Sequence, residues 1–333
     1  MDLQLQTLSG VLEQADYRLR SGSHAAPRLW PTGFRALDAN LSGGFRSGEL
    51  VLLAGPQGLG KTTYALQILR YVANSGRSAV YFSFEHDPQG VLERLVAMEA
   101  GMIAGNNAVT RNRVRTSFEG TDGKSGALAE RLHDTEGGQQ AVEAVQSYAD
   151  RLMLHRSAGY QTTLDTIREV VDAVRAETKQ LPFVVVDYLQ KVKVTGPVMS
   201  EDDRITAVVE GLKDLALDLD LPIMAIVAAD KSGVEAGRRM RAHNMRGSSA
   251  LAYEADTVLI MNDKYDSVAR HHLVYNVGAA ERFKDWVVVT IEKNRSGTFG
   301  VDLEFRKRFD QCRFEGHGQQ VAEQLVDDRV YVE

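Results

Sequence analysis

Apolar and polar positions follow two alternating patterns along this chain. Near-continuous apolar runs, typical of buried strands, are separated by longer segments in which apolar residues recur at helical spacing. The runs that predict strands are Leu50–Ala54, Ala79–Phe84, Arg151–His155, Phe183–Asp187, Ile223–Ala228 and Thr257–Met261. The segments that predict helices are Leu8–Leu19, Thr62–Asn74, Pro88–Ala100, Ala127–Asp150, Thr162–Glu177 and Asp203–Asp218. Apolar strands that alternate with helices predict an α/β fold, with a mostly parallel sheet and helices on both faces.

The pattern changes after Asp256, where shorter strands are separated by turns. Trp286–Glu292, Gly300–Arg306 and Cys312–Glu315 predict a short antiparallel extension at the C-terminal side of the sheet. Residues 104–126 are rich in Asn, Arg, Gly and Ser and are expected to form a loop. We therefore expect an N-terminal arm or linker over residues 1–28, one globular domain over residues 29–315 and a tail over residues 316–333.

Composition narrows the class of protein without fixing its chemistry. The 333 residues, 44% of them hydrophobic, can bury one large α/β core. A net charge of −6 argues against a nonspecific polycation, although it allows a local basic surface. Cys312 is the single cysteine, which excludes an intramolecular disulfide and suits a reducing cytosol. We expect no signal peptide, no membrane span and a cytoplasmic location.

A complete phosphate-binding motif, Gly-x-x-x-x-Gly-Lys-Thr, occupies residues 55–62. It follows an apolar strand and precedes a helix, which is the context that the motif requires. Glycines let backbone N–H groups turn toward phosphates, and the helix N-terminus adds partial positive charge. Lys61 is expected to reach the β- and γ-phosphates of a nucleoside triphosphate, and the Thr62 hydroxyl to bind Mg²⁺. The expected nucleotide contacts are Gly55, Pro56, Gln57, Gly58, Leu59, Gly60, Lys61, Thr62 and Thr63.

Two acidic residues at strand ends complete a candidate ATPase site. Asp187 ends an apolar strand, where it is expected to hold Mg²⁺, although an acid at that position can also cap the following turn. Glu85 follows the strand after the phosphate-loop helix, where a carboxylate can polarise the attacking water. Asp87 competes for that role, although it can instead cap the helix that begins at Pro88.

In this order, these elements resemble the RecA-like ATPase domain of the DnaB-type replicative helicases. The resemblance begins at Pro-Thr-Gly-Phe-Arg-Ala-Leu-Asp (residues 31–38) and continues through the phosphate loop to Phe-Ser-Phe-Glu (residues 82–85). Asp-Tyr-Leu-Gln at residues 187–190 and Lys-Asn-Arg-Ser-Gly at residues 293–297 are similar to two later motifs of that family. The resemblance covers about residues 29–315 and implies an enzyme that hydrolyses ATP with Mg²⁺.

The resemblance also implies an active site shared between subunits. Lys293 and Arg295 match the family's Lys and Arg that reach the γ-phosphate held by the neighbouring subunit. With Lys61 and Glu85 they form the expected catalytic set, which requires a closed homo-oligomeric ring, expected to be a hexamer. Cations at a strand end are otherwise typical of a solvated sheet edge.

A basic stretch between two predicted strands provides candidate contacts for single-stranded DNA. Its cations are Lys231, Arg238, Arg239, Arg241 and Arg246. In the family that the chain resembles, loops at this place face the central channel and contact the DNA backbone, and basic side chains suit that role because phosphates dominate affinity. The alternative is an exposed loop with solvated charge.

The chain departs from the family pattern at three places that bear on function. Ala229 stands where the family carries a Gln that senses the γ-phosphate, and Gly-Ser-Ser-Ala at residues 247–250 is closer to RadA- or KaiC-like ATPases. Residues 1–28 are not expected to take the place of the family's N-terminal helical domain. The main hypothesis is a DnaB-type helicase or translocase that acts in DNA replication. The alternative is a RadA- or KaiC-like ATPase that serves recombination, or acts as a nucleotide-driven switch, without unwinding DNA.

Overall fold

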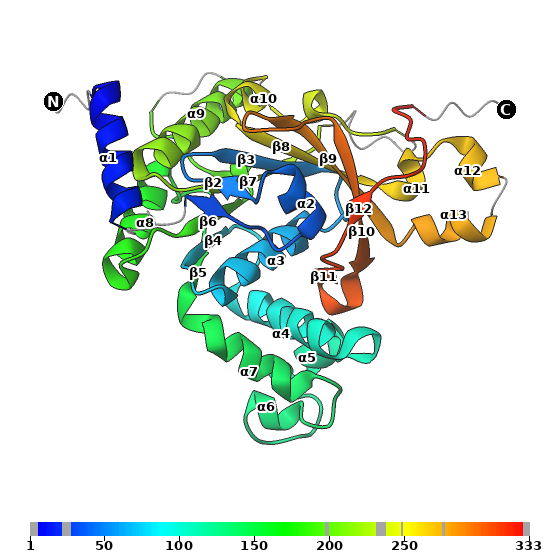
Figure 1. Cartoon of the computed structure of the whole chain (residues 1–333). Coiled ribbons are helices and arrows are strands. Elements are labelled where there is room, and N and C mark those ends of the chain that lie inside the picture. Colours follow the sequence, from blue (N-terminus) through cyan, green and yellow to red (C-terminus); the bar gives the residue numbers. More distant parts are fainter. Residues whose placement is uncertain are drawn as a thin grey trace.

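The structure, a computed structural model, describes residues 6–21, 28–196, 200–230, 238–247, 249–274 and 277–328. Within these residues the chain forms a central sheet with helices on both faces (Figure 1). No helix in the described ranges is long and apolar enough to cross a bilayer.

A ten-stranded sheet runs through the molecule in the order β11-β10-β9-β8-β3-β7-β6-β4-β5, and β12 pairs with β10. Strands β8, β3, β7, β6, β4 and β5 run parallel to one another, whereas β9 to β12 add an antiparallel extension beyond β8. A separate two-stranded sheet pairs β1 with β2. The strands are β1 (Leu29–Trp30), β2 (Phe45–Arg46), β3 (Leu50–Gly55), β4 (Ala79–Ser83), β5 (Leu152–Arg156), β6 (Phe183–Asp187), β7 (Ile223–Ala228), β8 (Thr257–Asp263), β9 (Trp286–Asn294), β10 (Val301–Arg308), β11 (Arg313–Phe314) and β12 (Gln319–Gln320).

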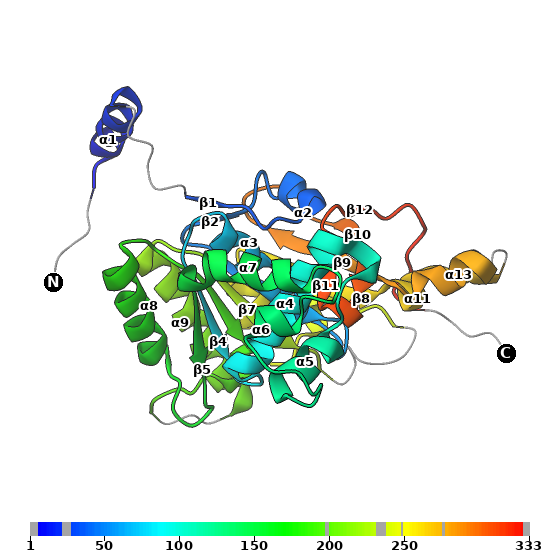
Figure 2. The same cartoon turned by 90° about the horizontal axis from the view of Figure 1, so that it is seen from below.

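Helices cover both faces because alternate residues of each parallel strand point to opposite sides, and both sides are apolar. One face packs against α3, α4 and α7, and the other against α8, α9 and α10 (Figures 1 and 2). The α1 helix buries none of its residues. The helices are α1 (Leu8–Arg20), α2 (Arg35–Asn40), α3 (Lys61–Asn74), α4 (Pro88–Ala104), α5 (Arg111–Glu119), α6 (Leu128–Arg131), α7 (Gly138–Tyr148), α8 (Leu164–Thr178), α9 (Glu201–Leu219), α10 (Ala250–Glu254), α11 (Lys264–Ser267), α12 (Arg270–Val274) and α13 (Val277–Phe283).

The predicted α/β class, the parallel sheet and its antiparallel extension are confirmed. Two local predictions are wrong. The single helix expected over residues 127–150 is divided into α6 and α7, because Gly137 adopts a left-handed backbone with φ of +73°. The loop expected over residues 104–126 contains α5, a polar helix that buries only Val114 and Ser117. Helices α11 to α13, between β8 and β9, were not predicted.

The order of the sheet determines where functional side chains can meet. β3 lies between β8 and β7, and β6 separates β7 from β4. Because these strands are parallel, the segments that follow β3, β4, β6 and β7 emerge at one edge of the sheet. The phosphate-binding motif, Glu85 and Asp187 all lie at that edge.

Candidate active site

Glycines in a left-handed backbone conformation shape the loop between β3 and α3. Gly58 has a φ of +83° and Gly60 a φ of +86°. A Cβ added at Gly60 would lie 2.7 Å from the ring of Phe309, so this position requires glycine for both its backbone and its space. Helix α3 begins directly afterwards at Lys61. Its first N–H groups have no partner within the helix and form a site that favours a phosphate.

Lys61 lies over the loop that precedes it. Its Nζ donates hydrogen bonds to the carbonyl oxygens of Gly55 at 2.7 Å and Pro56 at 2.9 Å. Burial lowers the pKa of Lys61 from its ordinary value, and the nearby carboxylates of Asp187 and Glu85 oppose that shift. The ammonium group is therefore held at the position where the loop would receive a phosphate chain.

Asp187 and Thr62 converge at the end of β6. The Thr62 hydroxyl donates to Asp187 Oδ2 at 2.7 Å, and the Tyr81 hydroxyl donates to the same oxygen at 2.7 Å. Burial raises the pKa of Asp187, while the hydrogen bonds from Tyr81 and Thr62 oppose the rise. A hydroxyl and a carboxylate are hard oxygen donors that suit Mg²⁺. No group of three metal-ligating side chains occurs in the described residues, so an ion here would need water and phosphate for its remaining ligands, as is usual for Mg²⁺.

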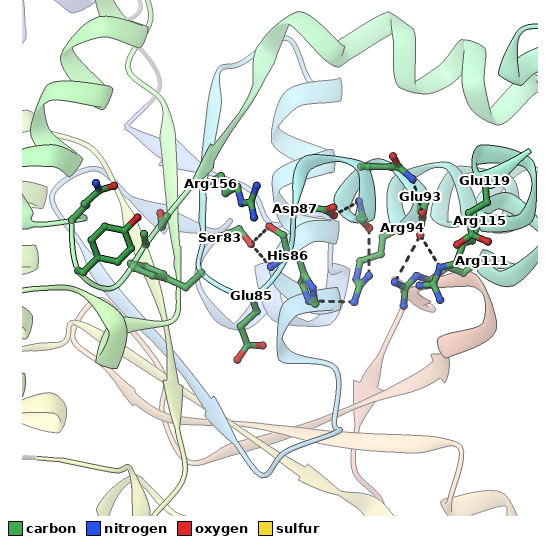
Figure 3. A pocket seen from close by; sticks show the side chains of 17 residues that line it. Ser83, Glu85, His86, Asp87, Glu93, Arg94, Arg111, Arg115, Glu119 and Arg156 are labelled. Atoms are coloured by element: carbon green, nitrogen blue, oxygen red, sulfur yellow. Dashed lines mark hydrogen bonds and ion pairs between the residues drawn. The ribbon is translucent and has the colours of Figure 1, made fainter.

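Glu85 faces the same cavity from the end of β4. The cavity has a volume of about 550 Å³ and is lined by the phosphate loop, Glu85 and Asp187. Asp87, the competing candidate, accepts a hydrogen bond from the Gly90 N–H at 2.8 Å and is the N-cap of α4. In Figure 3 the Glu85 side chain points away from Asp87. This geometry favours Glu85 over Asp87 as the residue that activates water.

The cavity also includes side chains that the sequence did not identify: His86, Arg94, Arg111, Phe309 and Cys312. Arg94 Nη2 lies 3.2 Å from His86 Nε2. Burial lowers the pKa of His86 to about 4, with a further contribution from Arg94 and Arg111. His86 is therefore neutral near pH 7 and can accept a hydrogen bond from Arg94. No motif marks these residues, because they come from separate elements that only the fold brings together.

A second polar cavity, of about 840 Å³, is lined by the residues drawn in Figure 3 and shares part of its lining with the first. Glu85, His86, Arg94 and Arg111 line both cavities. Glu93 is buried among the arginines and lies 3.2 Å from Arg115 and 3.9 Å from Arg111. The polar wall between the two cavities is therefore rich in guanidinium groups.

Lys293 and Arg295 lie away from the phosphate loop of their own chain. Lys293 is opposite Val258, near the start of β8, whereas the phosphate loop follows the end of β3, which is parallel to β8. Lys293 Nζ donates to the carbonyl oxygens of Ala252 and Tyr253, both at 2.8 Å. Arg295 donates to Tyr253 O at 2.9 Å and lies 3.3 Å from Asp256. These two cations are therefore at the edge of the sheet opposite the phosphate site.

The predicted DNA-binding residues occupy different environments. Lys231 lies outside the described residues. Arg239 is buried, forms an ion pair with Asp302 and donates to Thr290 Oγ1 at 2.8 Å. It therefore anchors the segment to β9 and β10 and is not placed at the surface. Arg238, Arg241 and Arg246 are partly exposed and form ion pairs with Asp328, with Glu292 and Asp327, and with Glu201, respectively.

Gln190 joins the basic segment, residues 238–246, to the cavity lined by the phosphate loop, the candidate nucleotide cavity. Its side-chain amide donates to Arg246 O at 2.9 Å and accepts from the Ala228 N–H at 3.2 Å. The Arg246 N–H in turn donates to Ala228 O at 2.8 Å. Arg246 and Ala229 also line the nucleotide cavity. A side chain just after Asp187 thus contacts both the end of β7 and the basic segment.

Comparison with known families identifies the domain. A family model described as DnaB-like helicase C terminal domain matches residues 30–315. The chain belongs to this family. Among its relatives are the Replicative DNA helicase DnaB of Treponema pallidum, 26% identical over 280 residues, and that of Haemophilus influenzae, 24% identical over 323 residues. These alignments cover 84% and 95% of this chain, but 54% and 61% of the relatives. The chain therefore spans little more than half the length of these DnaB relatives.

Two solved structures have a fold similar to that of this chain. One of them, described as an ATPase domain, has a TM-score of 0.72 and 19% identity, covering 93% of this chain and 99% of that one. A DnaB-like replicative helicase, described together with its interactions with primase, has a TM-score of 0.71 and 18% identity, covering 92% and 68%. The predicted resemblance to DnaB-type ATPase domains and the predicted RecA-like fold are confirmed.

Proposed function

We propose that this chain is the motor domain of a DnaB-type helicase, which hydrolyses ATP at the interfaces of a ring and moves along single-stranded DNA in the cytoplasm. The observation that carries the proposal is the division of the ATPase machinery between two edges of one sheet. Lys61, Thr62, Asp187 and Glu85 line a cavity at one edge, whereas Lys293 and Arg295 lie at the other. Membership of the DnaB family supports the same assignment.

The residues at the phosphate edge suit hydrolysis of a phosphoanhydride. The loop N–H groups and Lys61 hold the β- and γ-phosphates. Thr62 and Asp187 are the residues that would hold Mg²⁺, which neutralises charge on the phosphate oxygens when it is bound. Glu85 accepts a proton from the attacking water, whose oxygen bonds to the γ-phosphorus as the bond to the bridging β–γ oxygen breaks.

The opposite edge supplies cations to the next subunit. A head-to-tail interface places the Lys293 edge of one copy against the phosphate edge of another, and repetition of that interface closes a ring, a hexamer by the family resemblance. Arg295 and Lys293 then stabilise negative charge on the transferring phosphoryl group. In the isolated chain these side chains contact backbone carbonyl groups of α10 and Asp256, which keeps them at that edge.

The basic segment provides the contact with DNA. Arg246 has a side chain that is 56% exposed and lies close to the nucleotide cavity, so a phosphate contact there can respond to nucleotide. In the family, a Gln that senses the γ-phosphate could couple nucleotide to DNA, but Ala229 stands at that position here. Gln190 offers another connection, since it bonds to Ala228 and Arg246 and follows the Asp187 strand closely. This connection favours the translocase over the RadA- or KaiC-like switch.

Mixing two inactive variants tests the shared site. Lys61→Ala removes the phosphate-loop cation and Arg295→Ala removes the finger, so each variant alone should lose ATP turnover, while Arg295→Ala should still bind nucleotide. Random mixing of equal amounts should restore about one quarter of the wild-type turnover, because one interface in four then combines an intact loop with an intact finger. No recovery on mixing would refute a finger acting on the neighbouring subunit.

Two further measurements complete the test. Arg306→Ala is a matched control, because Arg306 is also a partly exposed arginine on the antiparallel extension, paired with Asp285 at 3.4 Å. It should leave turnover unchanged. Turnover should rise with single-stranded DNA, and a forked duplex should be unwound in a strand-displacement assay. Hydrolysis that ignores DNA would exclude the translocase and favour the switch.

A further inference from the structure

The C-terminal strap, residues 319–328, returns across the molecule to the basic segment, residues 238–246. It begins with β12, which pairs with β10 opposite Leu303 and Glu304. It then runs beside α11, where the Ala269 N–H donates to Gln324 O at 2.9 Å and the Val326 N–H donates to Ser267 O at 2.8 Å. Figure 1 shows this red segment leaving β12 toward α11. The sequence had predicted only a tail here.

The last described residues of the strap contact the basic segment directly. The Arg239 N–H donates to Asp327 O at 2.8 Å, and Arg238 and Asp328 form an antiparallel bridge. Asp328 lies 3.1 Å from the Arg238 guanidinium, and Asp327 lies 2.6 Å from that of Arg241. Two consecutive carboxylates therefore form ion pairs with two of the arginines that are expected to contact DNA phosphates.

The chemistry of these contacts matches that of a phosphate backbone. Successive negative charges on an extended chain are presented to guanidinium groups, as single-stranded DNA would present them. The ion pairs are exposed, with Asp327 and Asp328 side chains 59% and 64% accessible, so each contributes little and can be exchanged for another anion. Buried Arg239, bonded to Asp302 and Thr290, keeps the basic segment in place when its surface partners change.

We infer that the C-terminal strap competes with single-stranded DNA for the basic segment and thereby limits the affinity of the motor domain for DNA. This inference rests on the proposed DNA-binding function. The strap is released from Arg238 and Arg241 when DNA binds, while its attachment to β10 and α11 keeps it close enough to return. Arg241 also pairs with Glu292 at 2.8 Å, so it keeps a carboxylate partner when the strap leaves.

The test is binding of a fluorescein-labelled oligothymidylate to the full chain, followed by anisotropy over a range of salt concentrations. Asp327→Asn with Asp328→Asn should tighten binding about three- to tenfold at low salt. The slope of the logarithm of the association constant against the logarithm of the salt concentration should steepen by about 0.7 if one arginine is released from the strap. It should steepen by about 1.4 if both arginines are released. Arg238→Gln should weaken binding more in this double variant than in the wild type.

A second pair of aspartates provides the matched control. Asp218 and Asp220 are also exposed, by 60% and 52%, and each pairs with an arginine, Arg168 at 2.8 Å and Arg28 at 2.6 Å. Asp218→Asn with Asp220→Asn makes the same change in net charge at the C-terminal end of α9. If both pairs tighten binding equally, net charge is the cause and competition by the strap is refuted.

The remaining outcomes separate this inference from the proposed function. Unchanged affinity and slope in the Asp327 and Asp328 variant, with weaker binding in Arg246→Gln, would overturn the strap's role and leave DNA binding intact. If the variant with Asp327→Asn and Asp328→Asn binds DNA and the wild type does not, the result would support the competition and show that the strap blocks DNA binding completely. If neither binds DNA and Arg246→Gln changes nothing, the proposed DNA-binding function fails and the strap's role fails with it.

Discussion

Gln190 gives the sharpest test of how the nucleotide cavity and the basic segment are connected. Gln190→Ala removes the hydrogen bonds to Arg246 O at 2.9 Å and from the Ala228 N–H at 3.2 Å. The side chain is 8% exposed, so water cannot readily replace these bonds. Leaving two partly buried backbone groups without a side-chain partner should lower the free energy of unfolding by about 1 to 3 kcal/mol.

The functional effect should be separable from this loss of stability. If Gln190 carries the coupling, DNA stimulation of ATP turnover should fall about fivefold, which corresponds to about 1 kcal/mol of coupling free energy. Turnover without DNA should remain close to the wild-type value, because the Gln190 side chain bonds to β7 and the basic segment rather than to the phosphate loop. Steady-state turnover with and without single-stranded DNA measures the coupling, and urea unfolding measures the stability.

Gln67 provides a control with the same chemistry elsewhere. Its side-chain amide donates to Phe314 O at 3.0 Å and accepts from the Phe314 N–H at 2.8 Å, and it is 6% exposed. Gln67→Ala should therefore lose at least as much stability and keep its DNA stimulation. If both variants retain full stimulation, Gln190 is a structural brace and the proposed coupling is refuted.

Three other changes have defined expectations. Lys61→Ala should abolish ATP turnover without unfolding the domain, as circular dichroism would show, because the Lys61 ammonium bonds to carbonyl groups of its own loop. Asp187→Asn should abolish Mg²⁺-dependent turnover yet raise the melting temperature of the protein without nucleotide or metal near pH 7. Burial raises the pKa of Asp187 in the folded state, so ionisation of this carboxyl group costs stability as pH rises. The difference in melting temperature from the wild type should therefore vanish as pH falls below 3.8. Glu99→Ala should lower the free energy of unfolding by about 3 kcal/mol in urea titrations, because it strips the partly buried Arg70 of a bidentate partner at 2.5 and 2.7 Å. Equal losses from Glu99→Ala and from the exposed Asp16→Ala would contradict the last expectation.

The sequence predicted the sheet well because its strands are buried on both faces. Val184, Val185 and Val186 in β6 are fully buried, and such runs have few alternatives to a central strand. The polar helix α5 gave no such signal, since its stability depends on packing against α4 and α6. Gly137 could have indicated the break between α6 and α7, because a glycine within a helical pattern often ends a helix.

Within the site, the sequence could bring together only residues that are close in sequence or that lie at strand ends. The phosphate loop is contiguous, and Asp187 lies beside Thr62 because β6, which ends at Asp187, and β3, which leads into the phosphate loop, are parallel strands separated only by β7. Arg239 shows the limit of such reasoning. Its sequence neighbours suggest a solvated basic loop, but its partner Asp302 lies on β10, and only the fold reveals that the pair is buried.

Asp256 links Arg295 to the start of β3. Its carboxylate accepts from the Leu50 N–H at 2.8 Å and from Lys213 at 2.7 Å, and it lies 3.3 Å from Arg295. Leu50 begins β3, and the phosphate loop follows the other end of that strand. Because β3 is fully buried and closely packed, a shift of Arg295 toward a nucleotide on a neighbouring subunit would displace the start of β3. The other end of β3 leads into the phosphate loop of the same chain. One rigid strand thus links the proposed finger to the phosphate loop of the same chain.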